Sequence, residues 1–245
     1  MSKPISCGIC QPHYLPWIGY FEMIDRVDVF VFLDDVQFIK REWKNRNRIR
    51  KSARSQEPLW LTVPISRDTR RCPLDRTFPA NHGHWHVSHV RSIKHTYSHA
   101  PEFDTVSDEV FEAMRPGRGE SLADVNIRST IGICKLMGIK TQLVRSSQMN
   151  TPGAKGDKLL NICDMLGAEH YLANDRSEAY LDLDCFVDGG IAVEFQRYLH
   201  PVYGQWHRSV PLPFLSHLSI VDLLFNHGAA AGMSIVRSGR GKKSS

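Results

Sequence analysis

Short apolar runs alternate with amphipathic segments along most of the chain. Residues 5–10 and 29–33 are largely apolar runs, typical of strands that are buried on both faces. Between them, residues 17–27 place apolar side chains at helical spacing, and Pro16 is suited to the first turn of a helix. A strand, a helix and a second buried strand in this order predict the opening of a parallel α/β fold.

The alternation continues toward the end of the chain. Helices are expected over residues 82–99, 102–114, 121–137, 155–166 and 218–225. Strands are expected over residues 141–145, 169–173 and 192–198. Gly138 and Gly167 are suited to end the helices that precede them. The pattern therefore predicts a mostly parallel, Rossmann-like sheet flanked by helices.

One segment departs from this pattern. From Arg46 to Arg50, arginines alternate with uncharged residues, which is the period of a strand rather than of a helix. A weaker alternation follows over residues 59–65. We expect an antiparallel, basic hairpin inserted near residues 45–65.

The length of the chain, 245 residues, is enough for one domain with its own core. We expect a single α/β domain over residues 1–236, with a helical subregion at about residues 82–138, and a basic disordered tail over residues 237–245. No apolar stretch is long enough for a transmembrane helix, and the first residues do not resemble a signal peptide. The six scattered cysteines indicate free thiols in a reducing, cytoplasmic environment.

The positive charge of the chain is concentrated in one segment. The net charge is +5, but residues 40–76 hold twelve Lys or Arg against four Asp or Glu, a local charge of +8. Such a concentration favours a phosphate-bearing partner, either a small molecule such as a nucleotide or a nucleic acid. The alternative is a hairpin whose charges are merely solvated.

The loop after the first strand is the first candidate site. Polar residues at the carboxyl end of a strand, before a helix N-terminus, stand where open α/β sheets bind ligands. Gln11 and His13 are the preferred functional residues there. Tyr14 is a further binding candidate, although the aromatic residues of this loop also fit a role in the core.

Two carboxylates follow the second strand and define another candidate. Asp34 and Asp35, with Gln37 nearby, are expected at the same sheet edge as the first loop. They could bind magnesium or act as a general base. The alternative is a turn cap with an ion pair to the basic segment.

The basic segment itself offers phosphate ligands. Arginine forks bind phosphate oxygens in a bidentate manner, amides add neutral donors, and an indole ring offers a stacking face. The candidates in this segment are Lys40, Arg41, Trp43, Asn45, Arg46 and Asn47.

Histidines and cysteines elsewhere do not indicate a metal centre. His82, His86 and His89 share a face of the expected helix, but no carboxylate or cysteine completes a ligand set. We retain His89 as a phosphate-binding candidate. Cys7 and Cys10 lie three apart on a strand and point to opposite faces, so neither zinc nor haem is expected.

Polar residues gather again near the C-terminal end. The candidates are Gln196, His200, Tyr203 and Gln205, which follow the last strand. Asp222 and Asn226 lie one turn apart within the apolar final helix, where buried polar groups need partners. They are either structural or orient His200.

Several motifs resemble the WbqC-like protein family. The long ones are Gln11-Pro-His-Tyr-Leu-Pro-Trp-Ile-Gly-Tyr-Phe21, Asp28-Val-Phe-Val-Phe-Leu-Asp-Asp-Val-Gln-Phe38 and Lys40-Arg-Glu-Trp-Lys-Asn-Arg-Asn-Arg48. The shorter ones are Trp60-Leu-Thr-Val-Pro64, Tyr180-Leu-Asp182, His200-Pro-Val-Tyr203 and Leu218-Ser-Ile-Val-Asp-Leu-Leu-Phe-Asn226.

This family is commonly found with genes for O-antigen and other surface polysaccharides. The resemblance implies a transferase, with glycine or acyl transfer to an amino sugar as the suggested reaction, and it adds Tyr180 as a binding candidate. Cys10 stands where the family usually has His, and His13 where it often has Asn. These departures lie in loops, which normally set substrate choice, so the substrate stays open.

Our first hypothesis is a transferase that forms an amide or C–N bond between an amine of glycine type and an activated phosphate-bearing substrate, such as a nucleotide-linked amino sugar. His13, Asp34, Asp35 and His200 are its catalytic candidates. The alternatives are a nucleic-acid binding or base-modifying protein, an ATP-dependent ligase of the nucleotidylyltransferase type, and a noncatalytic partner protein. Magnesium is a candidate cofactor, and a homo-oligomer is a candidate assembly.

Overall fold

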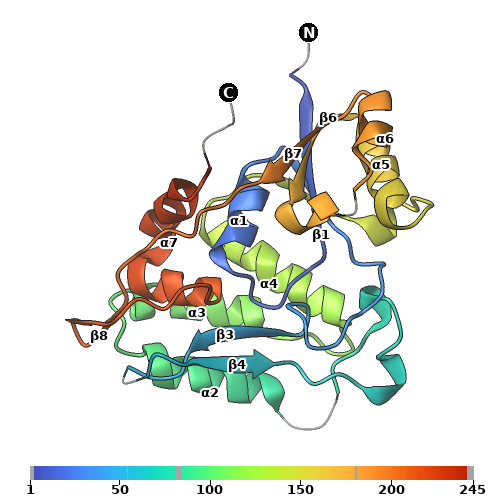
Figure 1. Cartoon of the computed structure of the whole chain (residues 1–245). Helices are drawn as coiled ribbons and strands as arrows, with labels where there is room; N and C mark the ends of the chain where they lie inside the picture. Colours follow the sequence, from blue (N-terminus) through green and yellow to red (C-terminus); the bar gives the residue numbers. More distant parts are fainter. Residues whose placement is uncertain (1–2, 54, 81–83, 180, 242–245) are drawn as a thin grey trace.

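One parallel sheet organises the chain, and the computed structural model describes it over residues 3–53, 55–80, 84–179 and 181–241. The strands are β1 (Ile5–Cys10), β2 (Val29–Phe32), β5 (Gln142–Arg145), β6 (Ala168–Asn174) and β7 (Ala192–Gln196). Their spatial order is β5-β2-β1-β6-β7, and every neighbouring pair is parallel (Figure 1). The predicted α/β class with a parallel sheet is confirmed.

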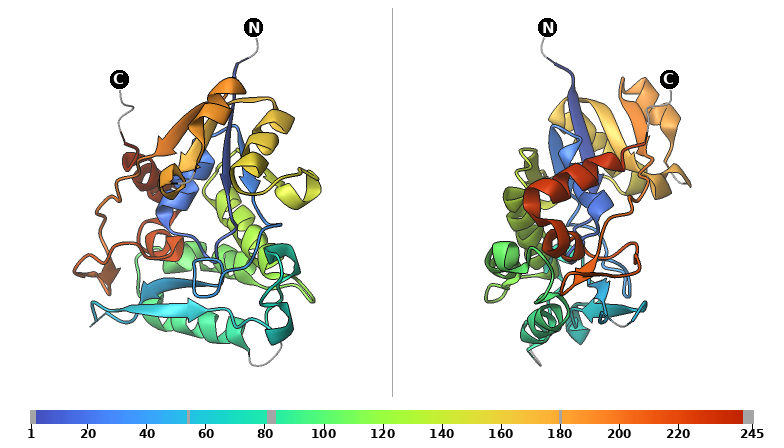
Figure 2. Two further views of the ribbon diagram at one scale, coloured as in Figure 1. Left: turned by 45° about the vertical axis from the view of Figure 1, so that its right-hand side comes forward. Right: turned by 90° about the vertical axis from the view of Figure 1, so that its left-hand side faces the viewer.

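Helices cover both faces of this sheet. They are α1 (Ile18–Asp25), α2 (Trp85–Tyr97), α3 (Phe103–Met114), α4 (Leu122–Leu136), α5 (Lys155–Leu166), α6 (Leu183–Asp188) and α7 (Ile220–Ser238). Successive residues of β2 serve opposite faces, because Phe30 and Phe32 join the core with α1 and α4 while Val29 and Val31 join the core with α5. Figure 2 shows α5 and α6 on the opposite side of the sheet from α4.

The strand order places a reversal next to β1. From β1 the chain first builds outward through β2 and β5, and then returns to the other side of β1 with β6 and β7. The loops after β1 and β6 therefore diverge at the carboxyl edge. In open α/β sheets this topological switch point is where ligands bind.

The predicted basic hairpin is present beside the sheet. β3 (Arg46–Arg50) pairs antiparallel with β4 (Pro58–Thr62), with Arg46 opposite Thr62 and Arg50 opposite Pro58. Ile49 and Leu61 are buried in the same core as α1. Asn47 fixes the hairpin to the loop after β1, since its Nδ2 donates to the carbonyl of Tyr14 (3.1 Å) and of Leu15 (2.6 Å).

Short elements complete the structure. The 3-10 helices are η1 (Arg67–Thr69), η2 (Leu74–Arg76), η3 (Ser146–Gln148) and η4 (Asp175–Ala179), and a small hairpin is formed by β8 (Trp206–His207) and β9 (Val210–Pro211). Within the described residues, no helix combines the length and the apolar character needed to cross a membrane.

The C-terminal helix is longer than its apolar pattern predicts. α7 continues through a kink at Gly228, where φ is 70°, and ends at Ser238. The sequence predicts a disordered tail from Arg237. In the structure, residues 237–241 form the end of α7 and the residues after it, and they lie beside α1. Arg237 pairs with Asp25 (2.7 Å), and Arg240 pairs with Glu22 (3.1 Å), which is buried in α1.

Candidate functional site

Four cationic side chains and one histidine come from the loop that follows β1 and from the segments next to it, and we call this group the cationic cluster. Its members are His13, Lys44, Arg46, Arg48 and Arg176. His13 lies in the loop between β1 and α1, Lys44 precedes β3, and Arg176 lies in η4 directly after β6. The cluster thus draws on the two loops of the switch point and on the hairpin.

His13 is neutral at neutral pH. Its ring lies 5.0 Å from the ring of Tyr20, measured between centroids. Burial, and then the positive charges of Lys44 and Arg176, lower the pKa of His13 to about 3. Within the described part of the chain no hydrogen bond occupies either ring nitrogen, so both are available to a ligand.

Lys44 is a buried lysine of the cluster. Its side chain pairs with Glu42, and the residue is 7% exposed. Burial lowers the pKa of Lys44, and Arg176 lowers it further, although the neighbouring Cys10 opposes this. Asn126, wholly buried in α4, fixes this segment because its Nδ2 donates to the carbonyls of Lys44 (2.7 Å) and Pro12 (3.0 Å).

Arg46 and Arg48 lie on one face of β3 with two indole rings. The guanidinium of Arg46 lies 4.2 Å from the ring centroid of Trp60, and that of Arg48 lies 5.6 Å from the rings of Trp43 and Trp60. Arg48 also donates to the carbonyl of His217 (3.0 Å). The Nε atoms of both arginines are buried without a partner among the described residues.

The charges of three guanidinium groups are therefore not neutralised. Across residues 3–53, 55–80, 84–179 and 181–241, no carboxylate lies within ion-pair distance of Arg46, Arg48 or Arg176. The only carboxylate in contact with the cluster there is Glu42, on Lys44. Such an excess of positive charge favours an anionic ligand, and planar guanidinium groups suit phosphate oxygens.

His200 lies in an aromatic stack beside the cluster. Its ring is stacked with Trp17 at 6.0 Å and lies 4.7 Å from the ring of His217. Its Nε2 accepts from the backbone N–H of His217 (3.1 Å), and its Nδ1 lies 2.9 Å from the carbonyl of Pro201. Both nitrogens are thus engaged by the protein, and burial lowers the pKa of His200.

Asp34 is enclosed by donors from η3 and β5. It is fully buried, and its carboxylate accepts from Arg145 Nε (2.6 Å), Ser147 N (2.9 Å) and Ser147 Oγ (2.8 Å). Arg145 also donates to Asp124 (2.6 Å), whose carboxylate completes the capping box of α4 with Ser121. The arrangement leaves no donor of a substrate an open approach to Asp34.

Asp35 is paired as well. Its carboxylate accepts from Lys158 Nζ (2.5 Å) in α5 and from Ser146 Oγ (2.6 Å). Asp34 and Asp35 do not fit a magnesium site, because each already neutralises a protein cation. Among the described residues, no three His, Cys, Asp or Glu side chains gather as ligands for a metal.

Several predicted binding residues hold the protein together instead. Tyr14 and His89 are buried and share a 2.8 Å hydrogen bond between Oη and Nδ1, and burial lowers the pKa of His89 to about 4. Asn45 Nδ2 donates to Val63 (3.0 Å). Gln196 Nε2 donates to the carbonyl of Gly19 (2.8 Å) and to the carboxylate of Glu22 (2.5 Å).

The C-terminal polar residues form a buried network around Asp222. This carboxylate accepts from Tyr97 Oη (2.8 Å), Tyr203 Oη (2.9 Å) and Gln205 Nε2 (2.7 Å). Gln205 in turn accepts from Arg50 Nη2 (2.5 Å), which ties α7 to β3. Burial raises the pKa of Asp222. The network donates no hydrogen bond to His200, but the ring of Tyr203 is stacked on that of His200 at 6.2 Å, so the network supports His200 by packing as well as joining α7 to Arg50.

The remaining predicted residues are more open. Gln37, Lys40 and Arg41 are exposed, and Gln11 is half-buried, with its carbonyl accepting from Tyr20 Oη (2.9 Å). Tyr180 lies outside the described residues.

Sequence reasoning did not select four residues of this region. Lys44 and Arg48 lie within the predicted basic segment, and the period of two puts Arg48 on the face of Arg46. Arg176 lies just after the strand predicted at residues 169–173, so the sequence already indicates that it lies at the carboxyl edge of the sheet. His217 gave no comparable signal, because its loop lies far along the chain from the hairpin.

The family model described as the WbqC-like protein family matches residues 11–233. This chain belongs to the WbqC-like protein family. It is also 32% identical over 229 residues to an uncharacterized protein of Mycobacterium tuberculosis (Rv1507c), covering 91% of this chain and 94% of the relative. No solved structure matches the chain. All members of the cationic cluster fall inside the matched range.

Proposed function

We propose that this WbqC-like protein is a transferase that forms an amide or C–N bond between an amine, such as that of glycine, and an activated phosphate-bearing substrate. One observation carries the proposal: Lys44 and Arg176 lie near a neutral His13 at the switch point of the sheet, and the hairpin joined to this loop carries Arg46 and Arg48 without a carboxylate partner among the described residues. Nucleotide-linked amino sugars belong to this substrate class.

The cluster supplies what such a reaction needs. Arg46, Arg48 and Arg176 bind the phosphate oxygens of the substrate. The amine nitrogen attacks the activated carbon, the bond from that carbon to the phosphate oxygen breaks, and the phosphate leaves with the bonding electrons. The guanidinium groups stabilise the charge that develops on this oxygen.

His13 is the group that accepts the proton of the amine. In the unliganded protein, Lys44 and Arg176 help to hold the pKa of His13 down. A bound phosphate offsets these charges, which raises the pKa of His13 toward its ordinary range and makes it an effective base. Asp34 and Asp35 are excluded from this role because each is held by protein donors.

A second candidate function is binding of single-stranded nucleic acid. The supporting observation is Trp60, which is 41% exposed and lies on the hairpin face with Arg46 and Trp43. Exposed aromatic rings beside arginines are typical of surfaces that stack bases. This alternative predicts a steep loss of affinity with salt, because bound phosphates release counterions.

The test is thermal stability of the full chain against a ligand panel. The panel holds pyrophosphate, a nucleotide-linked amino sugar, ATP and a short single-stranded DNA, each with and without magnesium. A ligand at about 100 times its Kd stabilises the folded state by about 2.7 kcal/mol, a shift of roughly 5–10 °C. We expect such a shift with the nucleotide-linked sugar in the native protein and a clearly smaller shift in Arg46→Gln.

A matched variant controls for loss of a surface cation. Lys140 is exposed and precedes β5, at the opposite edge of the sheet, so Lys140→Gln should respond to the sugar as the native protein does. A shift with DNA alone that disappears in about 0.5 M salt would replace the transferase by the second candidate.

A further inference from the structure

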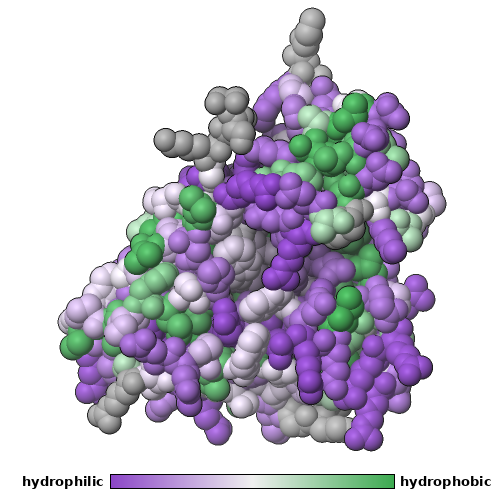
Figure 3. Space-filling view, viewed as in Figure 1, coloured by the Kyte–Doolittle hydropathy of each residue, from purple (hydrophilic) through white to green (hydrophobic). Residues whose placement is uncertain are grey.

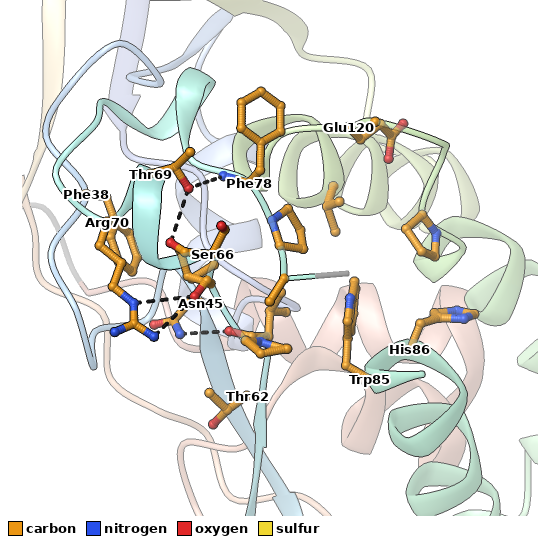
Figure 4. A pocket seen from close by; sticks show the side chains of 18 of the residues that line it. Phe38, Asn45, Thr62, Ser66, Thr69, Arg70, Phe78, Trp85, His86 and Glu120 are labelled. Atoms are coloured by element: carbon orange, nitrogen blue, oxygen red, sulfur yellow. Dashed lines mark hydrogen bonds between the residues drawn. The ribbon is translucent and has the colours of Figure 1, made fainter. Parts of the chain in front are cut away.

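A groove is lined by Asn45, which follows Lys44 of the cationic cluster in the chain. Its volume is about 1270 Å³. It lies between the segment after β4, residues 78–80, the start of α2 and the loop before α4 (Figure 4). No member of the cationic cluster lines it. The groove is therefore a separate place where a ligand could bind.

The walls of the groove carry an excess of positive charge. Lys40, Arg67, Arg70 and Arg118 line it, and none of them has an ion pair in the part of the chain that the structure describes. Of the two lining carboxylates, Glu120 is already neutralised by Arg128 (3.0 Å). Figure 3 shows hydrophilic side chains crowded at the lower right, where Figure 1 draws the segment after β4. This charge balance favours an anion.

Asn45 adds an unsatisfied acceptor to the groove. The residue is 6% exposed, and its Nδ2 is engaged by the carbonyl of Val63 (3.0 Å). Its Oδ1 has no partner among the described residues. Because buried polar atoms are normally hydrogen-bonded, a ligand with a donor such as a hydroxyl group would satisfy it.

Trp85 supplies a flat apolar wall. It begins α2 and lines the groove, and it is held from behind by edge contacts with Tyr14 (6.1 Å) and His89 (5.4 Å). Figure 4 shows Trp85 and Arg70 entering the pocket from opposite sides. A ligand that satisfies both needs a planar ring at one end and an anion at the other.

We propose that this groove is a nucleotide-binding site. The base stacks on Trp85, a sugar hydroxyl donates to Asn45 Oδ1, and the phosphates bind Arg67 and Arg70. The site is distinct from the cationic cluster, so this proposal goes beyond the transferase and does not depend on it.

The experiment is a calorimetric and tryptophan-fluorescence titration of the full chain with ADP and UDP. We expect binding to weaken at least tenfold in the double variant Arg67→Gln/Arg70→Gln. Arg71→Gln is the matched control, because Arg71 is exposed in the same segment but does not line the groove. Trp85→Leu should remove the fluorescence change on binding, and circular dichroism shows whether each variant is folded.

Further measurements distinguish binding at the groove from binding at the cationic cluster. Nucleotide binding should persist in Arg46→Gln, and pyrophosphate or a nucleoside alone should bind at least tenfold more weakly than ADP. If Arg46→Gln abolishes binding while the double variant leaves it unchanged, the nucleotide binds the cluster and the groove proposal fails, but the transferase proposal stands. In Arg46→Gln, where the cluster is weakened, binding of pyrophosphate as tight as that of ADP would overturn the nucleotide site. Binding of single-stranded DNA alone, or no binding of any nucleotide, would overturn it as well.

Discussion

The acidic pair at the end of β2 and the cationic cluster beside the loop after β1 share one edge of the sheet but differ in how their charges are satisfied. Every oxygen of Asp34 is met by a donor of the protein, from Arg145, Ser146 or Ser147. Arg46, by contrast, meets only the ring of Trp60 within the described residues. Both groups look functional in the sequence, and only their partners separate them.

The pairing of each group decides whether it is available to a ligand. Removal of a buried carboxylate that is already paired is costly, because its partner then loses its acceptor. A partly buried guanidinium without a partner costs stability in the free protein and recovers it when an anion binds. The comparison predicts that variants of the first group lose stability, whereas variants of the second lose binding.

The largest effect is expected for Asp34→Ala. The substitution leaves Arg145 Nε and the donors of Ser147 without their acceptor in a buried position, while Arg145 keeps Asp124, so we expect a cost of about 3 kcal/mol of unfolding free energy. Urea denaturation measures it. Ser147→Ala removes one donor and should cost about 1 kcal/mol. A stable Asp34→Ala protein without activity would reverse our comparison and make Asp34 catalytic.

A smaller effect is expected from acid. His89 has a folded-state pKa of about 4 and an ordinary value of 6.5, so below pH 6.5 the unfolded state binds a proton that the folded state does not. The contribution of the neutral His89 to the free energy of unfolding is complete above pH 6.5. It declines as pH falls toward 4, and the loss is about 2 kcal/mol at pH 5. Chemical denaturation at pH 7 and pH 5 measures it.

The variant His89→Gln should flatten this pH dependence by about that amount. His95→Gln, at an exposed position of the same helix, is the control and should leave the slope unchanged. An equal slope in native protein and His89→Gln would show that the histidine is not held neutral by burial.

Much of the fold could be predicted because its signals are local. The runs at residues 5–10 and 29–33 are largely apolar, and the period of two between Arg46 and Arg50 marks β3. α6 was not predicted, since its six residues are too few for a helical period and Leu183 and Val187 are exposed. The extension of α7 past Phe225 was not predicted either, because the segment beyond it contains Gly228 and small residues.

The roles of polar residues were harder to predict, because their partners are distant in the chain. Asp34 lies 111 positions from Arg145, and Gln205 lies 155 positions from Arg50. A sequence shows that such groups need partners but does not show whether the partner is the protein or a ligand. The position of His13 in the loop after β1 could be predicted, since it follows from β1 alone, whereas its role stays a prediction.

A moderate effect tests the second member of the acidic pair. Lys158→Met should cost about 1–2 kcal/mol, because Asp35 keeps its bond from Ser146 and is partly exposed. A double-mutant cycle with Asp35→Asn should give a coupling energy of about 1 kcal/mol or more. Absence of coupling would show that the pair does not neutralise Asp35, and would return it to the candidates for the base.

The smallest effect on stability is expected in the cluster itself. Arg46→Gln removes one cation–π contact with Trp60, so its unfolding free energy should change by less than about 1 kcal/mol. Differential scanning calorimetry without ligand checks this. A loss of unfolding free energy as large as that of Asp34→Ala would show that Arg46 is a structural residue. The cationic cluster would then not differ from the acidic pair in this respect.

The bond from Arg48 to the carbonyl of His217 spans 169 positions of the chain. During synthesis the hairpin leaves the ribosome long before residue 217 does, so a nascent chain carries its arginines exposed until the C-terminal segment arrives. Contacts of such long range are also slow to form in refolding, because closing a large loop costs entropy before the contact repays it. Anion binding by Arg48 should therefore appear only once the segment around residue 217 has packed against the hairpin.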